Sequence, residues 1–395
     1  MRQCACTRGV WWESGGVRAA RVWGVSDRRD WANLGDGPAG LIAERLLAND
    51  VADYICFRAV CRPWRICSTD PLAHGILDRR FHPHRWIMLR ETAGSPYCRC
   101  FMNVFAGYSR HVDLPELRGH DVFGPTTEGL LVLLDRATCV VRLLNPFTRQ
   151  IADFPSASTL MTEDLTSRED LLQVSGAGLA SDCTIAVHFR GIRTLAVAKQ
   201  GDGHWIVVDR GSYLLPAMSF AGRFYCATTQ AIMVVETIAD QPPRLVIAAK
   251  LTRPFARILL DTVHLVNNDG KLILVDRQCN GNENRKYKVY QVDLDARKIV
   301  PVHGLGGRAV FIGVELALSV SPSVFPSLRA DAIYLGFDWQ MTGILDNSPV
   351  HLMDGTADPR QYEDSVNGMP LYEPFDVDDY LSWCVTGYRD TFKDT

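Results

Sequence analysis

From residue 86 onward, short apolar runs of four to eight residues alternate with clusters of Gly, Asp, Asn and Pro. Runs of this length are typical of β-strands, whereas helices need longer periodic segments. Their regular return along the chain is typical of an all-β sandwich, barrel or propeller. Because the pattern covers most of the 395 residues, it restricts the fold to a mainly β class.

One unit recurs within this pattern: a Gly, a five-residue strand, and an Asp whose side chain can close the next turn. It occupies residues 129–135, 203–209 and 270–276, with a shorter relative at 222–226. The spacing exceeds the roughly 40 to 50 residues of a propeller blade, so we expect at least one further blade between copies. With roughly 45 residues per blade, residues 86–385 are predicted to form a β-propeller of about six blades.

Several local predictions accompany this fold. We expect a strand over 86–89, an Asn145-Pro146 turn between two strands, and a tight turn at 304–307 before a strand. Residues 71–85 are expected to be a linker with a short helix at 72–80. Loops are expected at 156–182, with a helix at 168–174, and at 276–286. The acidic C-terminal segment, with Asp376, Asp378 and Asp379, is expected to be a solvated tail.

Residues 31–70 have a helical period instead. Pro38 stands near a helix N-terminus, where its missing N–H costs nothing, and a first helix is predicted over 38–48. Asn49-Asp50 supplies a stop and a new N-cap, and a second helix is predicted over 51–62, ended by Pro63. Two helices of this size cannot bury their apolar faces alone, so this segment needs a third packing element or a partner protein.

The detailed sequence of this segment resembles a plant-type F-box. The resemblance rests on Leu34, on residues 41–46, on Asp50, and above all on Phe57-Arg58-Ala59-Val60-Cys61-Arg62-Pro63-Trp64-Arg65. Gly35-Asp36-Gly37-Pro38 stands where many F-boxes carry Leu-Pro and an acidic residue. An F-box implies docking onto a Skp-type adaptor and, through it, onto the cullin of an SCF ubiquitin ligase. The residues expected at the adaptor face or just beneath it are Leu34, Pro38, Leu41, Ile42, Leu46, Leu47, Val51, Ile55, Val60 and Trp64.

The remainder resembles the C-terminal domain of unknown function 295, or KIB-like domain, of plant F-box proteins. Residues 143–148, 304–313, 319–321 and 331–335 carry this resemblance, which implies a Kelch-like β-propeller. Together the two resemblances imply a substrate-recognition subunit of an SCF-type ubiquitin ligase, whose propeller binds a target protein. The sequence does not assign target-binding residues, because propeller loops carry specificity without a readable code.

The expected organisation is therefore a disordered leader (1–30), an F-box (31–70), a linker (71–85), a β-propeller (86–385) and a tail (386–395). The fold class is mainly β with a small all-α N-terminal module. Two alternatives remain: an F-box scaffold without degradative function, and a propeller enzyme with its residues gathered at the central channel.

The bulk composition limits the classes of partner that we expect. A formal net charge of -3 gives no basic field of the kind that nucleic-acid binding requires. No run of eighteen apolar residues and no signal-peptide core is found, so no membrane partner is expected. Scattered cysteines such as Cys56, Cys139 and Cys226 lie in apolar runs and are expected to be small buried hydrophobes in a cytoplasmic or nuclear protein with reduced thiols.

Candidate chemistry is sparse. His82, His84, Cys98 and Cys100 could bind zinc, but Cys-x-Cys is a poorer chelate than Cys-x-x-Cys. His188, His204 and His264 lie in or beside apolar strands, where structural histidines are commoner than catalytic bases. No nucleophile elbow, zinc-protease or kinase motif is present. We therefore expect no catalytic, cofactor or metal site.

Overall fold

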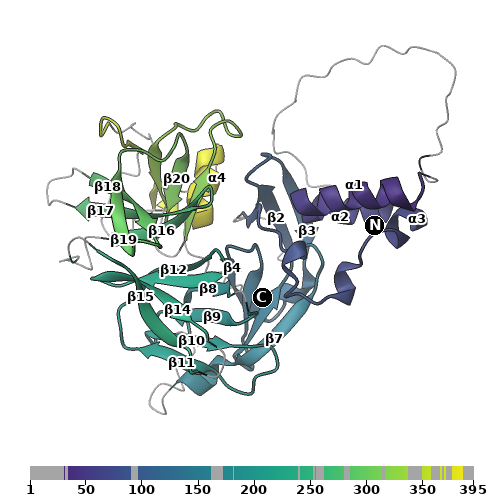
Figure 1. Ribbon diagram of the computed structural model, residues 1–395, viewed down its shortest axis with the longest axis horizontal. Helices are drawn as coiled ribbons and strands as arrows, with labels where there is room; N and C mark the ends of the chain where they lie inside the picture. Colours follow the sequence, from purple (N-terminus) through teal and green to yellow (C-terminus); the bar gives the residue numbers. More distant parts are fainter. Residues whose placement is uncertain are drawn as a thin grey trace.

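The computed structural model describes residues 31, 34–89, 97–161, 172–180, 182–238, 241–251, 254, 262–279, 285–313, 316–336, 349–356, 365–366, 369–370 and 376–385. The protein is mainly β, with a few helices at its N-terminal end (Figure 1). In Figure 1 the sheets curve around a common centre, and the helices attach on the outside beside β2 and β3.

Four sheets are regular antiparallel meanders of four strands, as a propeller requires. Their strands are β4 (His120–Pro125), β5 (Leu131–Asp135), β6 (Val140–Leu144), β7 (Ile151–Ser156); β8 (Val174–Leu179), β9 (Ile185–Phe189), β10 (Thr194–Ala198), β11 (Ile206–Arg210); β12 (Leu215–Phe220), β13 (Arg223–Ala227), β14 (Ala231–Glu236), β15 (Arg244–Lys250); β16 (Thr262–Asn268), β17 (Lys271–Cys279), β18 (Arg285–Asp293) and β19 (Lys298–Val302). The last two sheets are joined only by one parallel pair, Lys250 with Lys298.

Two further sheets depart from this pattern. The first has three antiparallel strands: β1 (Trp86–Met88), β2 (Cys98–Asn103) and β3 (Ser109–Asp113). The second is mixed, with β20 parallel to β22, and consists of β20 (Ala309–Ile312), β21 (Ala317–Val320), β22 (Ala332–Leu335) and β23 (Val350–His351). A short pair, β24 (Ser365–Val366) with β25 (Met369–Pro370), is separate. The propeller is thus confirmed, whereas six regular Kelch-like blades are not.

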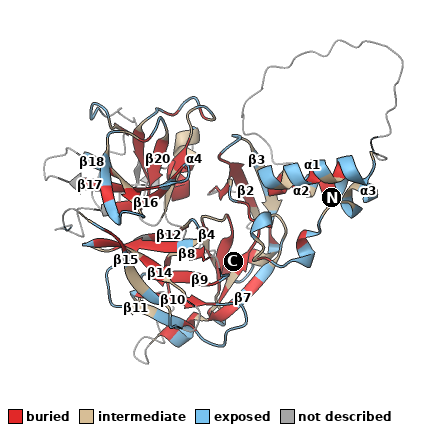
Figure 2. Cartoon of the chain, in the orientation of Figure 1, coloured by how far each residue is buried: buried red, intermediate tan, exposed pale blue. Residues whose placement is uncertain are grey.

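Apolar clusters lie between successive sheets and close the ring. Within the described residues, one cluster joins the β4–β7 and β8–β11 sheets, the next joins β8–β11 to β12–β15, and others continue through β16–β19 and β20–β23 back to β1–β3 and β4–β7. Figure 2 shows the strands as predominantly buried. The inner strands approach so closely that a Cβ added at Gly176 of β8 would lie 2.4 Å from the carbonyl oxygen of Ala217 in β12.

Helix α4 (Val377–Val385) contributes to the cluster between the last and first sheets, beside β20 in Figure 1. Leu381, Cys384 and Val385 are buried there, and Sγ of Cys384 lies 3.4 Å from the carbonyl oxygen of Met88 in β1. The expectation of a solvated acidic tail is therefore wrong for this part. Asp378 and Asp379 occupy the first helical turn, where carboxylates are stabilised by the helix dipole. Residues 386–395, the predicted tail, lie outside the described residues.

The Gly-strand-Asp repeat has a structural basis at some positions only. Gly129, Gly222 and Gly270 have positive φ angles (81°, 75° and 78°) in the turn before the second strand of a meander. The copy at 203–209 differs, since it falls on β11, the fourth strand of its sheet. In that sheet the turn before the second strand, β9, contains Cys183 instead of a glycine. Asp135 closes the next turn through the amides of Ala137 and Thr138, as predicted.

Other local predictions had mixed outcomes. The strand at 86–89 is confirmed as β1, and Oδ1 of Asn145 accepts from the amides of Phe147 and Thr148 in the predicted turn. The turn at 304–307 is also confirmed: it wraps the carboxylate of Asp331 and leads into β20.

One helix prediction and two loop predictions were wrong. Residues 72–80 form no α-helix, because only the 3-10 turns Pro71–Ala73 and Arg79–Phe81 occur near them. Strand β8 begins at Val174, inside the predicted loop and at the end of the predicted helix 168–174, whose residues 168–171 lie outside the described ones. Strands β17 and β18 extend into the predicted loop at 276–286, because cross-strand pairing continues as far as Cys279 with Arg285.

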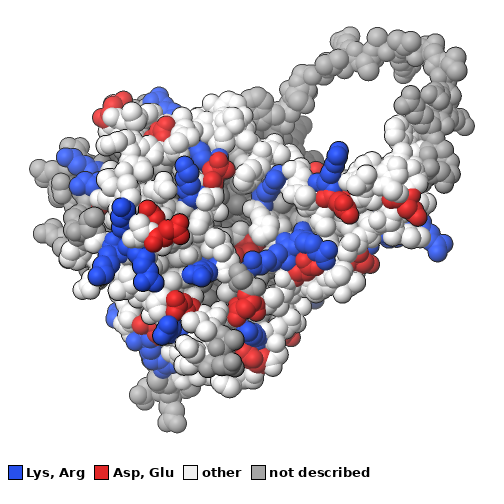
Figure 3. Space-filling model, viewed as in Figure 1, with Lys and Arg blue, Asp and Glu red and all other residues white. Residues whose placement is uncertain are grey.

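Surface chemistry is mixed. On the face shown in Figure 3, Lys and Arg side chains are interspersed with Asp and Glu. None of the described helices is long and apolar enough to cross a membrane. Cys139 and Cys226 are buried, as expected, but Cys56 is exposed, and its Sγ accepts from Nη1 of Arg110 in β3 at 2.9 Å. Residues 1–30, the predicted leader, lie outside the described residues.

Candidate functional site

The N-terminal helices form a compact three-helix module: α1 (Asp36–Asn49), α2 (Val51–Val60) and α3 (Arg62–Ile66). The predicted cap is confirmed, since the side chain of Asp50 accepts from the amides of Ala52 and Asp53. The second helix ends at Val60 rather than Arg62, because Cys61 is extended and Arg62 begins a third helix, with Pro63 in its first turn, where proline is tolerated.

A small apolar core holds these helices together. Ala39, Ala43, Val51, Tyr54 and Phe57 are buried with Phe81 of the following segment. Phe57 stacks on Trp64 at a centroid distance of 4.6 Å, and Phe147 from the β6–β7 turn packs against the same cluster. The propeller thus supplies part of the additional packing element that we predicted the two helices would need.

Arg58 is the polar counterpart of this core. Its Nη1 donates to the carbonyl oxygens of Arg65, Ser68 and Thr69, so it ties α2 to the chain that follows α3. Arg58 is therefore buried and structural. Within the motif from Phe57 to Arg65, which carried most of the F-box resemblance, Phe57 and Arg58 are buried, Cys61 and Trp64 are half-buried, and the other five residues are exposed.

The predicted adaptor residues fall into three groups. Val51 is buried beneath the surface, and five others are half-buried in or beside the core: Leu34, Leu46, Leu47, Ile55 and Trp64. Exposed on the outside are Pro38, Leu41, Ile42 and Val60, with exposed fractions of 61% for Leu41, 40% for Ile42 and 62% for Val60. Ile66 in α3 is also exposed, and the sequence did not single it out.

Helix α1 is accordingly apolar on two sides. Ala39, Ala43 and Leu46 follow the helical period towards the core, whereas Pro38, Leu41 and Ile42 follow it away from the core. Figure 2 shows this outer side of α1 as largely exposed. We refer to Pro38, Leu41, Ile42, Val60 and Ile66 as the outer apolar face.

A buried carboxylate fixes the module to the propeller. Asp50, in addition to capping α2, accepts from Nε1 of Trp86 at 3.0 Å and from Nδ2 of Asn103 at 2.5 Å. The hydroxyl of Tyr108 lies 3.4 Å from the same carboxylate. Asp50 therefore binds strand β1, the end of β2 and the β2–β3 turn at once.

Charged contacts surround this anchor. Nη2 of Arg110 in β3 lies 2.6 Å from the carboxylate of Asp53, and its guanidinium lies over the Trp86 ring. Burial and the neighbouring carboxylates of Asp50 and Asp53 raise the pKa of Tyr108, which keeps its hydroxyl protonated as a donor. The module is thus held in one orientation by directional contacts.

A small cavity lies where the first strands of three blades meet. Its volume is about 50 Å³, and it is lined mainly by the ends of β4, β8 and β12, with Leu316 and Cys384. Burial raises the pKa of the Cys384 thiol to about 12, so this thiol is protonated. Thr126, Thr127 and Ser175 are the other lining side chains with hydroxyls.

The candidate histidines of the propeller differ in burial. His188 is buried in β9 with Nδ1 2.6 Å from Oγ of Ser175, and burial lowers its pKa to about 4. His264 is also buried, with a pKa of about 3, whereas His204 is exposed. Within the described part of the chain, no group of three or more His, Cys, Asp or Glu residues could hold a metal ion.

Sequence reasoning missed the partners of Asp50. The pattern showed Asp50 as an N-cap, but Trp86, Asn103 and Tyr108 lie 36, 53 and 58 residues further along the chain. No local period links them.

A protein-family model matches most of the propeller domain. Residues 101–362 match the family described as the KIB1-4 beta-propeller. No curated protein matches the chain.

Solved structures give distant likenesses only. A catalytically inactive virginiamycin B lyase from Staphylococcus aureus with quinupristin is 11% identical, with 63% of this chain and 89% of that chain covered and a TM-score of 0.33. YCF48 from Cyanidioschyzon merolae is 8% identical, with 53% and 67% covered and a TM-score of 0.33. The dihydro-heme d1 dehydrogenase NirN is 14% identical, with 55% of this chain covered and a TM-score of 0.30, and this chain spans 47% of its length. Likenesses this distant say nothing about activity.

Proposed function

The chain belongs to the KIB1-4 β-propeller family, and from that premise we propose that it is a substrate-recognition subunit of an SCF-type ubiquitin ligase. In this proposal, α1–α3 are an F-box that binds a Skp-type adaptor and, through it, the cullin. The propeller binds a target protein. A propeller by itself supports protein–protein interaction, and the helical module supplies the more specific role.

The observation that carries the proposal is the outer apolar face. Leu41, Ile42 and Val60 have little reason to be exposed in a module that already has its own core and its own contact with the propeller. Each leucine or isoleucine buried by a partner contributes about 1.5–3 kcal/mol of transfer free energy. A face of this kind on a helical pair, joined to a motif that resembles an F-box, suits an adaptor.

The mechanism is positional. The Asp50 anchor holds the adaptor-binding helices in a fixed orientation to the propeller. A target bound to the propeller would therefore stay near the ubiquitin-conjugating enzyme, which raises its effective concentration at that enzyme. No chemical step by this chain is required.

The test is a pull-down with a purified Skp-type adaptor. The wild-type chain should be retained, and a Leu41→Asp, Ile42→Asp double variant should lose binding by more than about a hundredfold, because two buried apolar contacts become buried charges. The matched control is Leu72→Asp, Met353→Asp, which places the same substitutions at two exposed apolar positions outside the outer apolar face. Equal adaptor binding by both double variants would refute the assignment.

A second experiment separates a degradative subunit from an F-box scaffold. Proximity labelling with and without proteasome inhibition should yield a neighbour that accumulates only when the proteasome is blocked and only when α1–α3 are intact. Adaptor binding without such a neighbour would identify a scaffold instead.

A further inference from the structure

Lysine is confined to a small part of this chain. Of its 42 Lys and Arg residues, only seven are lysines, and none of these precedes residue 199. Five of the seven fall within residues 250–298. The seven are Lys199, Lys250, Lys271, Lys286, Lys288, Lys298 and Lys393.

The fold gathers five of these lysines on one side of the ring. Lys271 begins β17, Lys286 and Lys288 lie in β18, and Lys298 begins β19. Lys250 ends β15 and is the Cα partner of Lys298 in the parallel pair that joins the two sheets. In Figure 1, β17, β18 and β19 lie on the opposite side of the propeller from α1–α3. We refer to these five residues as the lysine group.

The side chains of the lysine group are accessible. All five residues are exposed, and no ion pair joins any of them to a carboxylate in the described part of the chain. Lys199 is also exposed, but its Nζ lies 3.2 Å from the carboxylate of Asp182. Lys393 lies outside the described residues. The lysine group therefore presents five unengaged ε-amino groups to a second macromolecule.

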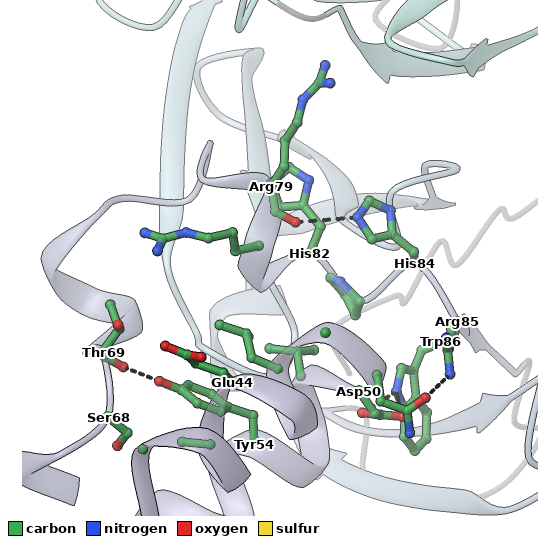
Figure 4. A pocket seen from close by; sticks show the side chains of 18 of the residues that line it. Glu44, Asp50, Tyr54, Ser68, Thr69, Arg79, His82, His84, Arg85 and Trp86 are labelled. Atoms are coloured by element: carbon green, nitrogen blue, oxygen red, sulfur yellow. Dashed lines mark hydrogen bonds between the residues drawn. The ribbon is translucent and has the colours of Figure 1, made fainter. Parts of the chain in front are cut away.

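The helical module uses arginine instead. Arg45 in α1 and Arg62 and Arg65 in α3 are exposed. Arg79 and Arg85 line the cleft of about 460 Å³ between α1 and the segment that enters the propeller, as Figure 4 shows. The part of the chain that we propose binds the adaptor thus carries cations but no ε-amino group.

Positive charge alone does not explain the change from arginine to lysine. A surface that binds an acidic partner is served at least as well by arginine, whose planar guanidinium pairs with carboxylates through two hydrogen bonds. Lysine differs from arginine in carrying a primary amine, which can be acylated and is the acceptor for ubiquitin. The lysine group therefore favours covalent modification over docking through charge.

We infer that the lysine group is the surface on which this chain is itself modified by ubiquitin. The inference rests on the proposed function, because the ligase would supply the co-reactant, the ubiquitin thioester of the conjugating enzyme. A deprotonated ε-amino group attacks the thioester carbonyl carbon, and an amide bond to the ubiquitin C-terminus forms. The carbon–sulfur bond breaks, the enzyme's cysteine leaves as a thiolate, and the surplus proton on the nitrogen passes to water.

The position of the lysine group has a consequence for the complex. Because it lies across the ring from α1–α3, a ubiquitin attached there does not cover the outer apolar face (Figure 1). The chain would therefore be modified while it is still bound to the adaptor.

A reconstituted reaction tests this surface. The full chain is incubated with the adaptor, the cullin, the activating and conjugating enzymes and ubiquitin, and modified lysines are identified by mass spectrometry. Most conjugates should lie on the lysine group. A combined variant that keeps the charge but removes the amines should form at least about tenfold fewer conjugates. It carries Lys250→Arg, Lys271→Arg, Lys286→Arg, Lys288→Arg and Lys298→Arg.

The matched control is Lys199→Arg, the same change at an exposed lysine outside the lysine group, and it should leave the conjugates unchanged. Thermal unfolding should be the same for all three proteins, because every substituted position is exposed and keeps its charge. Undiminished conjugates in the combined variant, or an equal loss in Lys199→Arg, would overturn the inference.

The adaptor pull-down separates this inference from the proposed function. A chain that binds the adaptor but carries no ubiquitin on the lysine group would refute the inference alone, whereas a chain that does not bind the adaptor would refute both. Conjugates should also disappear in the Leu41→Asp, Ile42→Asp double variant. Their persistence there would show that they form without the adaptor, which contradicts modification within the complex.

Discussion

Contacts between the blades are apolar, whereas the contact between the helical module and the propeller is centred on a buried carboxylate. Strands β9 and β10 are buried along their whole length, and each touches apolar neighbours in the next sheet. Asp50, by contrast, makes its contacts through hydrogen bonds to Trp86, Asn103 and Tyr108.

The two kinds of contact have different consequences: one determines the stability of the ring, and the other determines the orientation of the helical module. Apolar burial is non-directional and shared among many side chains, so it sets how stable the ring is. A buried, fully hydrogen-bonded carboxylate is directional, so it fixes how the module is held, and removing it leaves its donors unpaired. Four predictions test this contrast.

Phe189→Ala should have the largest effect. Phe189 is fully buried in β9 between two blades and meets Trp205 edge to face at 6.0 Å, so its removal leaves a cavity costing about 3–5 kcal/mol of unfolding free energy. Denaturant unfolding followed by tryptophan fluorescence measures it. Phe105→Ala, at an exposed position, is the control and should cost less than about 1 kcal/mol. Equal losses would show that the blades do not depend on this packing.

Asp50→Ala should cost about 3 kcal/mol, but locally. The change removes the α2 cap and leaves Nε1 of Trp86 and Nδ2 of Asn103 unpaired. Hydrogen exchange should therefore accelerate in α2 and β1 much more than in β9 or β17. If exchange accelerated equally in all of these elements, the separation of orientation from stability would be wrong.

Acid should weaken the blades through buried histidines. The pKa of His188 is about 4 in the folded chain and 6.5 when unfolded, so the unfolded state binds more protons between these values. Stability contributed by neutral His188 is thus present above pH 6.5 and is lost as the pH falls towards 4. Between pH 6.5 and 5.5 the loss is about 1 kcal/mol per such histidine.

His188→Gln does not titrate and keeps an acceptor for Ser175. Its unfolding free energy should therefore fall less than that of wild type over the same pH interval. Parallel pH profiles for the two proteins would contradict the assignment of this effect to His188.

Leu41→Asp, Ile42→Asp should change stability least, by no more than about 0.5 kcal/mol, because both side chains are already exposed. Thermal unfolding checks this and also validates the adaptor pull-down. A larger loss would mean that the outer apolar face is packed within the chain rather than available to a partner.

Local sequence patterns predicted the module well. Helical period, the Asp50 cap and the Asn145 turn each depend on residues a few positions apart, and each is present. The motif from Phe57 to Arg65 was recognisable for the same reason, since Phe57 and Trp64, and Arg58 and Arg65, are near neighbours in the chain. What the motif could not show is which of its side chains are internal: Phe57 and Arg58 are buried, whereas Val60 is exposed.

The C-terminal segment shows the opposite case. Its acidic residues, Asp376, Asp378 and Asp379, led to the prediction of a solvated tail. The structure instead buries Leu381, Cys384 and Val385 between the last sheet and the first. That position depends on closure of a ring whose two ends are nearly 300 residues apart, since Cys384 and Met88 are separated by 296 positions. The local amino-acid composition cannot predict a contact between residues so far apart in the chain.

The mainly β class, the helices and the Asp50 cap could be predicted from the sequence, because they follow from hydrophobic period and from a side chain that bonds to nearby backbone. Which side of α1 is exposed, which donors Asp50 accepts from, and how α4 packs between the last sheet and the first depend on the tertiary structure. Burial and hydrogen-bond pairing at these places involve segments that are far apart in the chain, so no local sequence pattern indicates them.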